Sequence, residues 1–112
     1  ENIIYSDLLR RGFNVDVGVV EYFPNVDGKT TRIQLEVDFV INRGNRRYYI
    51  QSAFAVNSEE KKEQERNSLK RIDDSFKKIM IVKDHIVPRY DAYGIYYIGI
   101  RDFLLMDDFL EA

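Results

Sequence analysis

The chain has 112 residues, 45% of them hydrophobic and 32% charged, which fits one compact domain with a modest core. A formal net charge of -2 excludes a global basic field that would attract nucleic acid or an anionic membrane, although local basic patches stay open. The sequence contains no cysteine, which excludes disulfides and thiolate metal sites. No apolar run reaches the roughly 20 residues of a membrane helix, and no signal segment opens the chain. We therefore expect a soluble cytoplasmic domain without a membrane partner.

The start of the chain bears on domain organisation. It opens without an initiator methionine and is already at helical spacing from Ile3 onward. The sequence shows no internal repeat, linker or low-complexity stretch. We therefore expect residues 1–112 to form a single domain that is a fragment of a longer protein, with a partner domain upstream.

The first half of the chain predicts one helix and three strands. Apolar residues recur at helical spacing from Ile3 to Leu9 and Gly12 then provides a glycine stop, so we expect an opening helix of about three turns. Alternating β-branched and aromatic residues predict three strands, at 13–23, 31–42 and 46–56. The turns at 24–28 and 43–45 are short, so the second and third strands should pair antiparallel.

The second half predicts two helices and two further strands. Ser58 is a good N-cap for a highly charged, mostly solvated helix whose apolar anchors are Leu69 and Ile72. A helix crossover into the buried strand at 76–82 favours a parallel neighbour in the same sheet. The remaining elements are a loop, a strand and a closing helix, at 85–94, 95–100 and 102–110. The fold class is thus α/β or α+β, a mixed sheet flanked by helices in the order α-β-β-β-α-β-β-α.

Two carboxylates interrupt the apolar run of the second predicted strand. Because side chains alternate along a strand, Glu36 and Asp38 should share one face with Val40, whereas Val37 and Phe39 should share the other. One face is thereby expected to be core and the other polar.

The third predicted strand sets Gln51 and Ala53 against these carboxylates. If the turn is centred within 43–45, Asp38 faces Gln51 and Glu36 faces Ala53. A shift of register by two residues would instead pair Glu36 with Gln51. Either register keeps all four side chains on one face.

Two interpretations of this polar face are open. It can be a solvated side of an antiparallel sheet, where charged residues need no further explanation. Alternatively, the small or apolar Val40 and Ala53 indicate a helix or a cleft above it. In a cleft, Asp38 and Glu36 would offer the hard oxygen ligands that Mg²⁺ takes in proteins, so they are the candidate metal ligands.

The element order and the acidic strand resemble a known fold. A helix, three strands with an acidic residue in the second, a helix and a strand form the core of the PD-(D/E)XK nuclease-like, or restriction-endonuclease-like, fold. Asp38 stands at the position of that fold's metal-binding aspartate. Gln51-Ser52-Ala53 stands at the position of its acid-x-lysine triplet.

A narrower resemblance covers essentially the whole chain. The stretches "ENIIYSDLLRRGFNVDVG", "QLEVDFVINRGNRRYYIQSAF" and "IDDSFKKIMIVKD" resemble the C-terminal domain of a family of bacterial and archaeal AAA+ type ATPases. This resemblance implies an upstream P-loop module that binds ATP and is a partner of this domain, alongside nucleic acid or another protein. The G-x-x-x-x-G-K-[ST] phosphate loop does not occur in this sequence, so ATP binding would belong to that upstream module.

The sequence departs from an active member of the nuclease-like fold. There, the triplet's carboxylate and the strand aspartate hold Mg²⁺, and the lysine activates water or stabilises negative charge. Here Gln51 replaces the carboxylate and Ala53 replaces the lysine, while Asp38 is kept. Losing one transition-state donor typically costs about 10²–10³ in rate. We therefore expect a degenerate site without catalytic residues.

Two other functions stay open. An active or residually active Mg²⁺-dependent nuclease would use Asp38 and Glu36, with Lys61 or Lys62 as a migrated cation and Glu1 as a first-helix acid. A purely structural docking or dimerisation domain would need none of these residues. The charged helix makes both lysines more typical of a solvated surface.

The turn after the second strand carries a basic cluster. Arg43, Arg46 and Arg47, with Tyr48 and Tyr49 behind them, could hold a phosphate backbone or stack on bases. A basic hairpin tip is also an ordinary way to keep a turn soluble. These arginines are the candidate nucleic-acid contacts.

Four tyrosines and one histidine complete the candidates. His85 lies beside an acid in a loop without a ligand partner at metal spacing, which indicates a surface role. The tyrosines indicate core and rim packing, or an interface with the missing ATPase module: Tyr90, Tyr93, Tyr96 and Tyr97.

Overall fold

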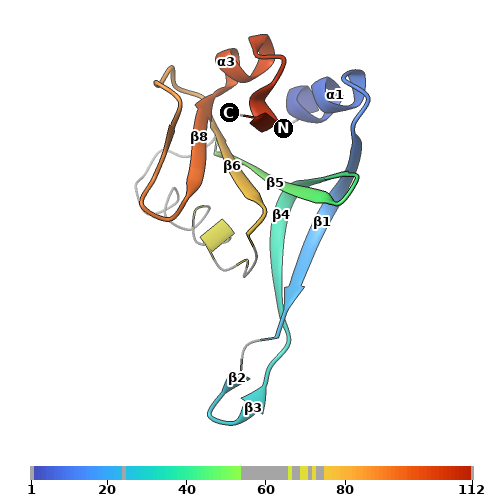
Figure 1. Cartoon of the computed structure of the whole chain (residues 1–112), viewed down its shortest axis with the longest axis vertical. Helices are drawn as coiled ribbons and strands as arrows, with labels where there is room; N and C mark the ends of the chain where they lie inside the picture. Colours follow the sequence, from blue (N-terminus) through green and yellow to red (C-terminus); the bar gives the residue numbers. More distant parts are fainter. Residues whose placement is uncertain are drawn as a thin grey trace.

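The computed structural model of the chain describes residues 2–23, 25–53, 66, 69–70, 72 and 75–111. Its centre is a six-stranded mixed sheet with the strand order β1-β4-β5-β6-β8-β7 (Figure 1). Helices α1 (Asn2–Arg10) and α3 (Ile100–Leu105) and a 3-10 turn, η1 (Phe109–Glu111), pack on one face of this sheet. The prediction of a mixed sheet with helices is thereby confirmed.

The strands agree with most of the sequence-based boundaries. They are β1 (Asn14–Tyr22), β4 (Ile33–Arg43), β5 (Arg46–Ala53), β6 (Lys77–Val82), β7 (Arg89–Tyr90) and β8 (Ile95–Gly99). Strands β1, β4 and β5 pair antiparallel in turn, and β6 runs parallel to both β5 and β8, as expected after a helix crossover. The predicted end of the third strand, 54–56, lies outside the described residues.

A short ribbon replaces the predicted turn at 24–28. Strands β2 (Asn25–Val26) and β3 (Lys29–Thr30) pair with each other at the end of the molecule that is remote from the helices (Figure 1). Asp27 and Gly28 connect them with φ values of 53° and 76°. Positive φ at both central residues is the signature of a two-residue hairpin turn whose twist matches the strands.

The opening helix ends at the glycine that the sequence predicts. Gly12 has a φ of 87°, and its N–H donates to the carbonyl of Leu9 over 2.9 Å. The N–H of Phe13 reaches back to the carbonyl of Leu8 over 3.1 Å. These two bonds form a Schellman motif, which turns the chain from α1 into β1.

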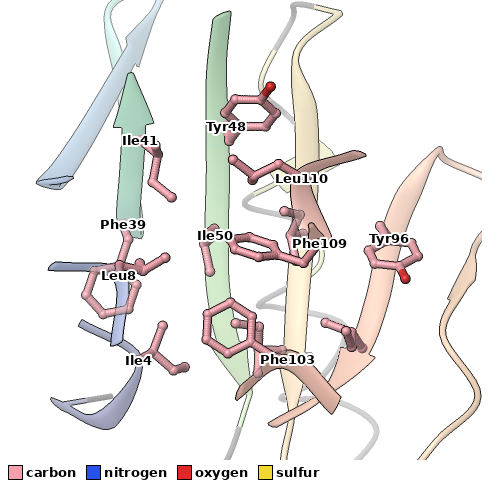
Figure 2. Close-up of a cluster of buried hydrophobic side chains, with 13 residues drawn as sticks. Ile4, Leu8, Phe39, Ile41, Tyr48, Ile50, Tyr96, Phe103, Phe109 and Leu110 are labelled. Atoms are coloured by element: carbon pink, nitrogen blue, oxygen red, sulfur yellow. The ribbon is translucent and has the colours of Figure 1, made fainter. Parts of the chain in front are cut away.

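The apolar side chains form two cores, one on each face of the sheet. The helix-side core joins α1, the sheet and the C-terminal elements (Figure 2) and contains Ile4, Leu8, Phe39, Ile41, Tyr48, Ile50, Ile79, Ile81, Tyr96, Ile98, Phe103, Phe109 and Leu110. The opposite-face core contains Val37, Val40, Tyr49, Ala53, Leu69, Ile72, Met80 and Ile95.

The opposite-face core shows that part of the predicted polar face is buried. Leu69, which is helical, and Ile72 are 0% and 5% exposed, so both predicted anchors of the charged helix are confirmed. They cover Val40 and Ala53, and a solvated face at these positions is therefore wrong. Most of the charged helix, including Lys61 and Lys62, lies outside the described residues.

One arginine fastens the N-terminal helix to the C-terminal segment. Arg11 Nε donates to Asp7 Oδ2 over 2.7 Å, and its terminal nitrogens donate to the carbonyls of Met106 and Phe103 over 2.7 Å each. The guanidinium carbon also lies 5.1 Å from the ring centroids of Phe103 and Phe109. Arg11 thus satisfies carbonyl groups at the C-terminal end of α3 that have no partner within the helix.

This contact explains a correction to the predicted closing helix. The sequence predicts one helix over 102–110, but α3 ends at Leu105 and η1 begins at Phe109. Met106 is extended (φ -88°, ψ 125°), and its carbonyl is bound by Arg11. The break lets Phe103 and Phe109 meet edge-to-face at 4.8 Å in the helix-side core.

No helix in the described residues is long and apolar enough to cross a membrane. The cytoplasmic location stays a prediction.

The two arginines that pair with Asp7 allow a controlled test of the Arg11 contact. Arg11 and Asp7 are 12% and 5% exposed in their side chains, whereas Arg10 is 71% exposed. We expect Arg11→Ala to lower the free energy of unfolding by at least about 2 kcal/mol, because it removes charged hydrogen bonds from buried groups. Arg10→Ala should cost less than about 1 kcal/mol. Urea unfolding measures both, and equal losses would contradict the assignment.

Candidate functional site

An irregularity in β4 determines which side chains reach the candidate site. In the pairing of β1 with β4, Asp16 opposes Val40, but Gly18 opposes Val37. Two residues of β4, Asp38 and Phe39, therefore lie opposite one residue of β1. This is a β-bulge, which inserts one extra residue and breaks the alternation of side chains.

The bulge overturns part of the predicted face assignment. Val37 is 2% exposed and packs with Val40 in the opposite-face core, whereas Phe39 lies in the helix-side core. The prediction that Val37 and Phe39 share a face is therefore wrong. The alternation pattern could not show this, because the extra residue changes neither composition nor hydrophobicity.

The bulge also separates the two candidate carboxylates. Glu36 pairs with Val19 of β1 and is exposed. Because successive side chains of a strand point to opposite faces, Glu36 projects away from the face of Val37 and Ala53. Asp38 instead turns toward β5. The structure thus does not bring Glu36 onto the face where Ala53 lies.

The predicted hairpin register is confirmed as far as the pair Phe39 and Ile50, and beyond this pair side chains make the hydrogen bonds between β4 and β5. Phe39 opposes Ile50 in the pairing of β4 with β5, as expected for a turn within 43–45. Beyond this pair, the N–H of Asp38 donates to Gln51 Oε1 over 2.9 Å. Ser52 donates twice to Asp38 Oδ2, from its N–H over 2.8 Å and from its hydroxyl over 3.0 Å. We call these three bonds the Asp38 clasp.

The clasp is a buried contact between the two strands. Gln51 and Ser52 are each 6% exposed, and Asp38 is half-buried. Each strand offers a backbone N–H to a side-chain oxygen of the other, so the clasp replaces ladder bonds where the strands part. An unpaired buried N–H would cost about 1–3 kcal/mol, which gives the three side chains a structural role.

The chemistry of the clasp differs from that of a cation site. Asp38 Oδ2 already accepts two hydrogen bonds, and Gln51 Oε1 is held by a backbone N–H. Ala53 is 6% exposed and supplies no amine. Within the described ranges, no group of three or more histidine, cysteine, aspartate or glutamate side chains could hold a metal ion.

A buried lysine on β6 is a residue that sequence reasoning missed. Lys78 is 9% exposed, opposes Tyr49 of β5, and donates from Nζ to the carbonyl of Phe76 over 2.8 Å. Gln51 opposes Met80, so Lys78 lies two positions from the clasp along the strand, about 7 Å at 3.3 Å per residue. Its amine is bonded to the carbonyl of Phe76, at the start of β6, whereas Ala53, where the resemblance expects a lysine, opposes Val82 at the end of that strand. The sequence signal for Lys78 is its position as the second of two lysines at the start of an apolar strand.

The candidate nucleic-acid contacts lie at the other end of β5. Arg43, Arg46 and Arg47 are exposed around a tight turn in which Gly44 has a φ of 61°. Arg47 Nε donates to Asn42 Oδ1 over 3.1 Å. Two hollows of about 300 and 530 Å³ meet at Arg43.

These hollows carry both signs of charge. The smaller is lined by Arg43, Asn45, Arg46, Tyr48 and Glu111. The larger is lined by Arg11, Gly12, Phe13, Asn14, Asn42, Arg43 and Asp107. The arginines can bind a phosphate, and each hollow also holds one carboxylate that would oppose it.

His85 is far more exposed than any residue of the clasp. Its side chain is 79% exposed, and Nε2 lies 3.8 Å from Asp102 Oδ2. The position agrees with the expected surface role.

Comparison with known proteins finds a relative but does not show a family. No family model matches the chain. An uncharacterized protein of Haemophilus influenzae is 33% identical over 105 residues, which are 94% of this chain and 22% of that protein. The chain therefore spans about a fifth of the length of this relative.

The clasp can be tested against a matched carboxylate. We expect Asp38→Ala to lower the free energy of unfolding by about 1–3 kcal/mol, because it leaves the N–H of Ser52 unpaired. Asp38→Asn keeps an acceptor oxygen and should cost less. Glu36→Ala, two residues away and exposed, should change stability by less than about 0.5 kcal/mol. Urea unfolding distinguishes them, and equal effects of the two alanine variants would exclude the clasp as a stabilising contact.

Proposed function

We propose that this chain is a non-catalytic, nuclease-like domain that acts as an accessory module of an AAA+ type ATPase. In this proposal the module recognises nucleic acid or a protein partner, and ATP binds to a P-loop module elsewhere in a longer cytoplasmic protein. The resemblance of three stretches to such C-terminal domains supports it. A relative that is several times longer than this chain is compatible with a multi-domain parent.

The order of elements also supports the nuclease-like part of the proposal. Helix α1 precedes three antiparallel strands, β1, β4 and β5, and helical residues then precede the parallel strand β6. The restriction-endonuclease-like core has this order. The ribbon of β2 and β3 would be an insertion between its first two strands.

The observation that carries the proposal is the position of Asp38 beside Gln51 and Ser52. A bulge turns the carboxylate of Asp38 toward the triplet position of β5, where a nuclease of this fold holds its metal. The opposing side chain is a neutral amide, and its oxygen accepts the N–H of Asp38. Two carboxylates and a lysine would stabilise a pentavalent phosphate. One carboxylate, whose Oδ2 already accepts two hydrogen bonds from Ser52 of the neighbouring strand, lacks these partners.

A plasmid-nicking assay tests this function. The wild-type chain, incubated at high concentration with Mg²⁺ or Mn²⁺ and supercoiled DNA, should give no more nicked or linear product than Asp38→Asn. The physical reason is the loss of both the second carboxylate and the lysine, each of which contributes to the metal site or to the transition state. Metal-dependent cleavage by the wild type that Asp38→Asn abolishes would overturn the proposal in favour of an active nuclease.

A further inference from the structure

Two exposed tyrosines stand at the β7–β8 hairpin, outside the Asp38 clasp. Tyr90 on the edge strand β7 is 50% exposed, and Tyr93 in the following turn is 59% exposed. Asp91 Oδ1 fixes this turn, because it accepts the N–H groups of Tyr93 over 2.8 Å and of Ile95 over 3.0 Å. Gly94 completes the turn with a φ of 80°. The hairpin therefore presents its rings on a bonded scaffold.

Basic side chains lie by the ring of Tyr93, where Lys70 Nζ is 3.8 Å from the ring centroid. Tyr90 instead pairs with Tyr96 of the helix-side core, and Lys77 beside it donates to the carbonyls of Phe109 and Leu110 over 3.2 and 3.4 Å. Two arginines lie by the same hairpin: Arg66, with Cζ 5.9 Å from the centroid of Tyr93, and Arg89, with Cζ 5.1 Å from that of Tyr97. Lys70 and these two arginines lie within the range of a cation–π contact, which is about 6 Å. Arg89 lies over Tyr97, which packs against the opposite-face core, so this cluster is on the other face of the sheet from Tyr90 and Lys77. We call Arg66, Lys70, Arg89 and Tyr93 the tyrosine–cation surface.

The charge state of the neighbouring ring suits an anionic ligand. Burial raises the pKa of Tyr97, and Asp91 raises it further. Tyr97 therefore stays protonated at neutral pH and adds no negative charge beside Arg89. The carboxylate of Asp91 lies by the same ring and opposes an anion there. Its Oδ1 accepts two backbone N–H groups, and three cations lie at this surface.

We infer that the tyrosine–cation surface binds single-stranded nucleic acid. A ring that is open to solvent, such as that of Tyr93, can stack on an unpaired base, and the cations at this surface can neutralise the adjoining phosphates. In a duplex the base faces are covered, so only the phosphate contacts would remain. A hydrophobic protein interface fits less well, because three cations lie at this surface and an interface core is depleted of charge.

This inference names the partner class and the surface of the accessory module, and in that respect it rests on the proposed function. It uses different residues. The hairpin lies beside the start of β8, which pairs with the start of β6, whereas the Asp38 clasp lies near the last residues of β5. The binding test of the hairpin surface and the nicking test of the Asp38 clasp can therefore give a negative result independently of each other.

Fluorescence anisotropy with a labelled oligothymidylate of about 20 nucleotides tests the inference, since one binding fold covers about 4–16 nucleotides. At low salt the wild-type chain should bind this probe at least about tenfold more tightly than a duplex of the same length. Tyr93→Ala should weaken binding about tenfold, as expected for one stacking ring, while Tyr93→Phe keeps the ring and should bind within about twofold of the wild type. Lys70→Gln should weaken binding and reduce its salt dependence.

Phe23→Ala is the matched control. Phe23 is an aromatic ring that is 58% exposed, close to the 59% of Tyr93, but it lies before the β2–β3 ribbon. Its removal should leave affinity unchanged. Circular dichroism checks that each variant is folded, and Tyr93→Phe keeps the test decisive if Tyr93→Ala unfolds.

Three results would overturn the inference. The first is undetectable oligothymidylate binding at low salt. The proposal that the domain is non-catalytic would not be affected, because the nicking assay tests it separately. The second is equal affinity for the duplex, which would indicate phosphate contacts alone. The third is a loss on Tyr93→Phe or Phe23→Ala as large as that on Tyr93→Ala in folded protein, which would exclude stacking on Tyr93.

Discussion

The extra residue in β4 is the constraint on which the rest of the structure depends. Without the bulge, Val37 and Phe39 would lie on one face and Asp38 would take part in a regular ladder. With it, Phe39 enters the helix-side core and Val37 enters the opposite-face core. Asp38 is left between the strands, where its carboxylate binds Ser52. The β-bulge thus places Val37 and Phe39 in different cores and directs the Asp38 carboxylate toward β5, which creates the candidate site.

The hydrogen bonds of the Asp38 clasp use the same side chains that the proposed function assigns to a degenerate metal site. In the nuclease-like fold proposed for this chain, the strand aspartate and the carboxylate of the neighbouring triplet hold the metal together. Here the carboxylate of Asp38 accepts hydrogen bonds from Ser52, and Gln51 offers a neutral oxygen where a second carboxylate would repel Asp38 in the absence of a metal. The same three side chains are therefore compatible with the proposed non-catalytic role. In that proposal, recognition falls to other surfaces, such as the arginines around Gly44 or Tyr93 of the β7–β8 hairpin.

The sequence predicts the parts of the fold that depend on local rules. Alternation and the turn around Gly44 give β4, β5 and their register, and Gly12 ends α1 as expected. The sequence predicts a charged helix between β5 and β6 and with it their parallel pairing, and the predicted anchors Leu69 and Ile72 are buried. These features follow from spacing and turn chemistry, which neighbouring residues determine.

Other features depend on contacts between residues that are distant in sequence. The closing helix breaks at Met106 because Arg11, from the other end of the chain, takes its carbonyl. The short strand β7 forms only by pairing with β8, and nothing local distinguishes it from a loop. The site is predicted in part: Asp38 and Gln51 do meet, but Glu36 leaves their neighbourhood because the alternation pattern carries no trace of the bulge.

The central claim is that the Asp38 carboxylate binds a neighbouring strand and not a catalytic cation. Titration of the ¹⁵N-labelled chain with Mn²⁺, observed through its amide NMR signals, tests this claim most directly, because a bound paramagnetic ion broadens the signals nearest to it. The account predicts that the amides of Asp38 and Ser52 broaden no more than those of exposed acidic residues such as Glu36. Selective, saturable broadening of Asp38, Gln51 and Ser52 that Mg²⁺ reverses by competition would contradict it.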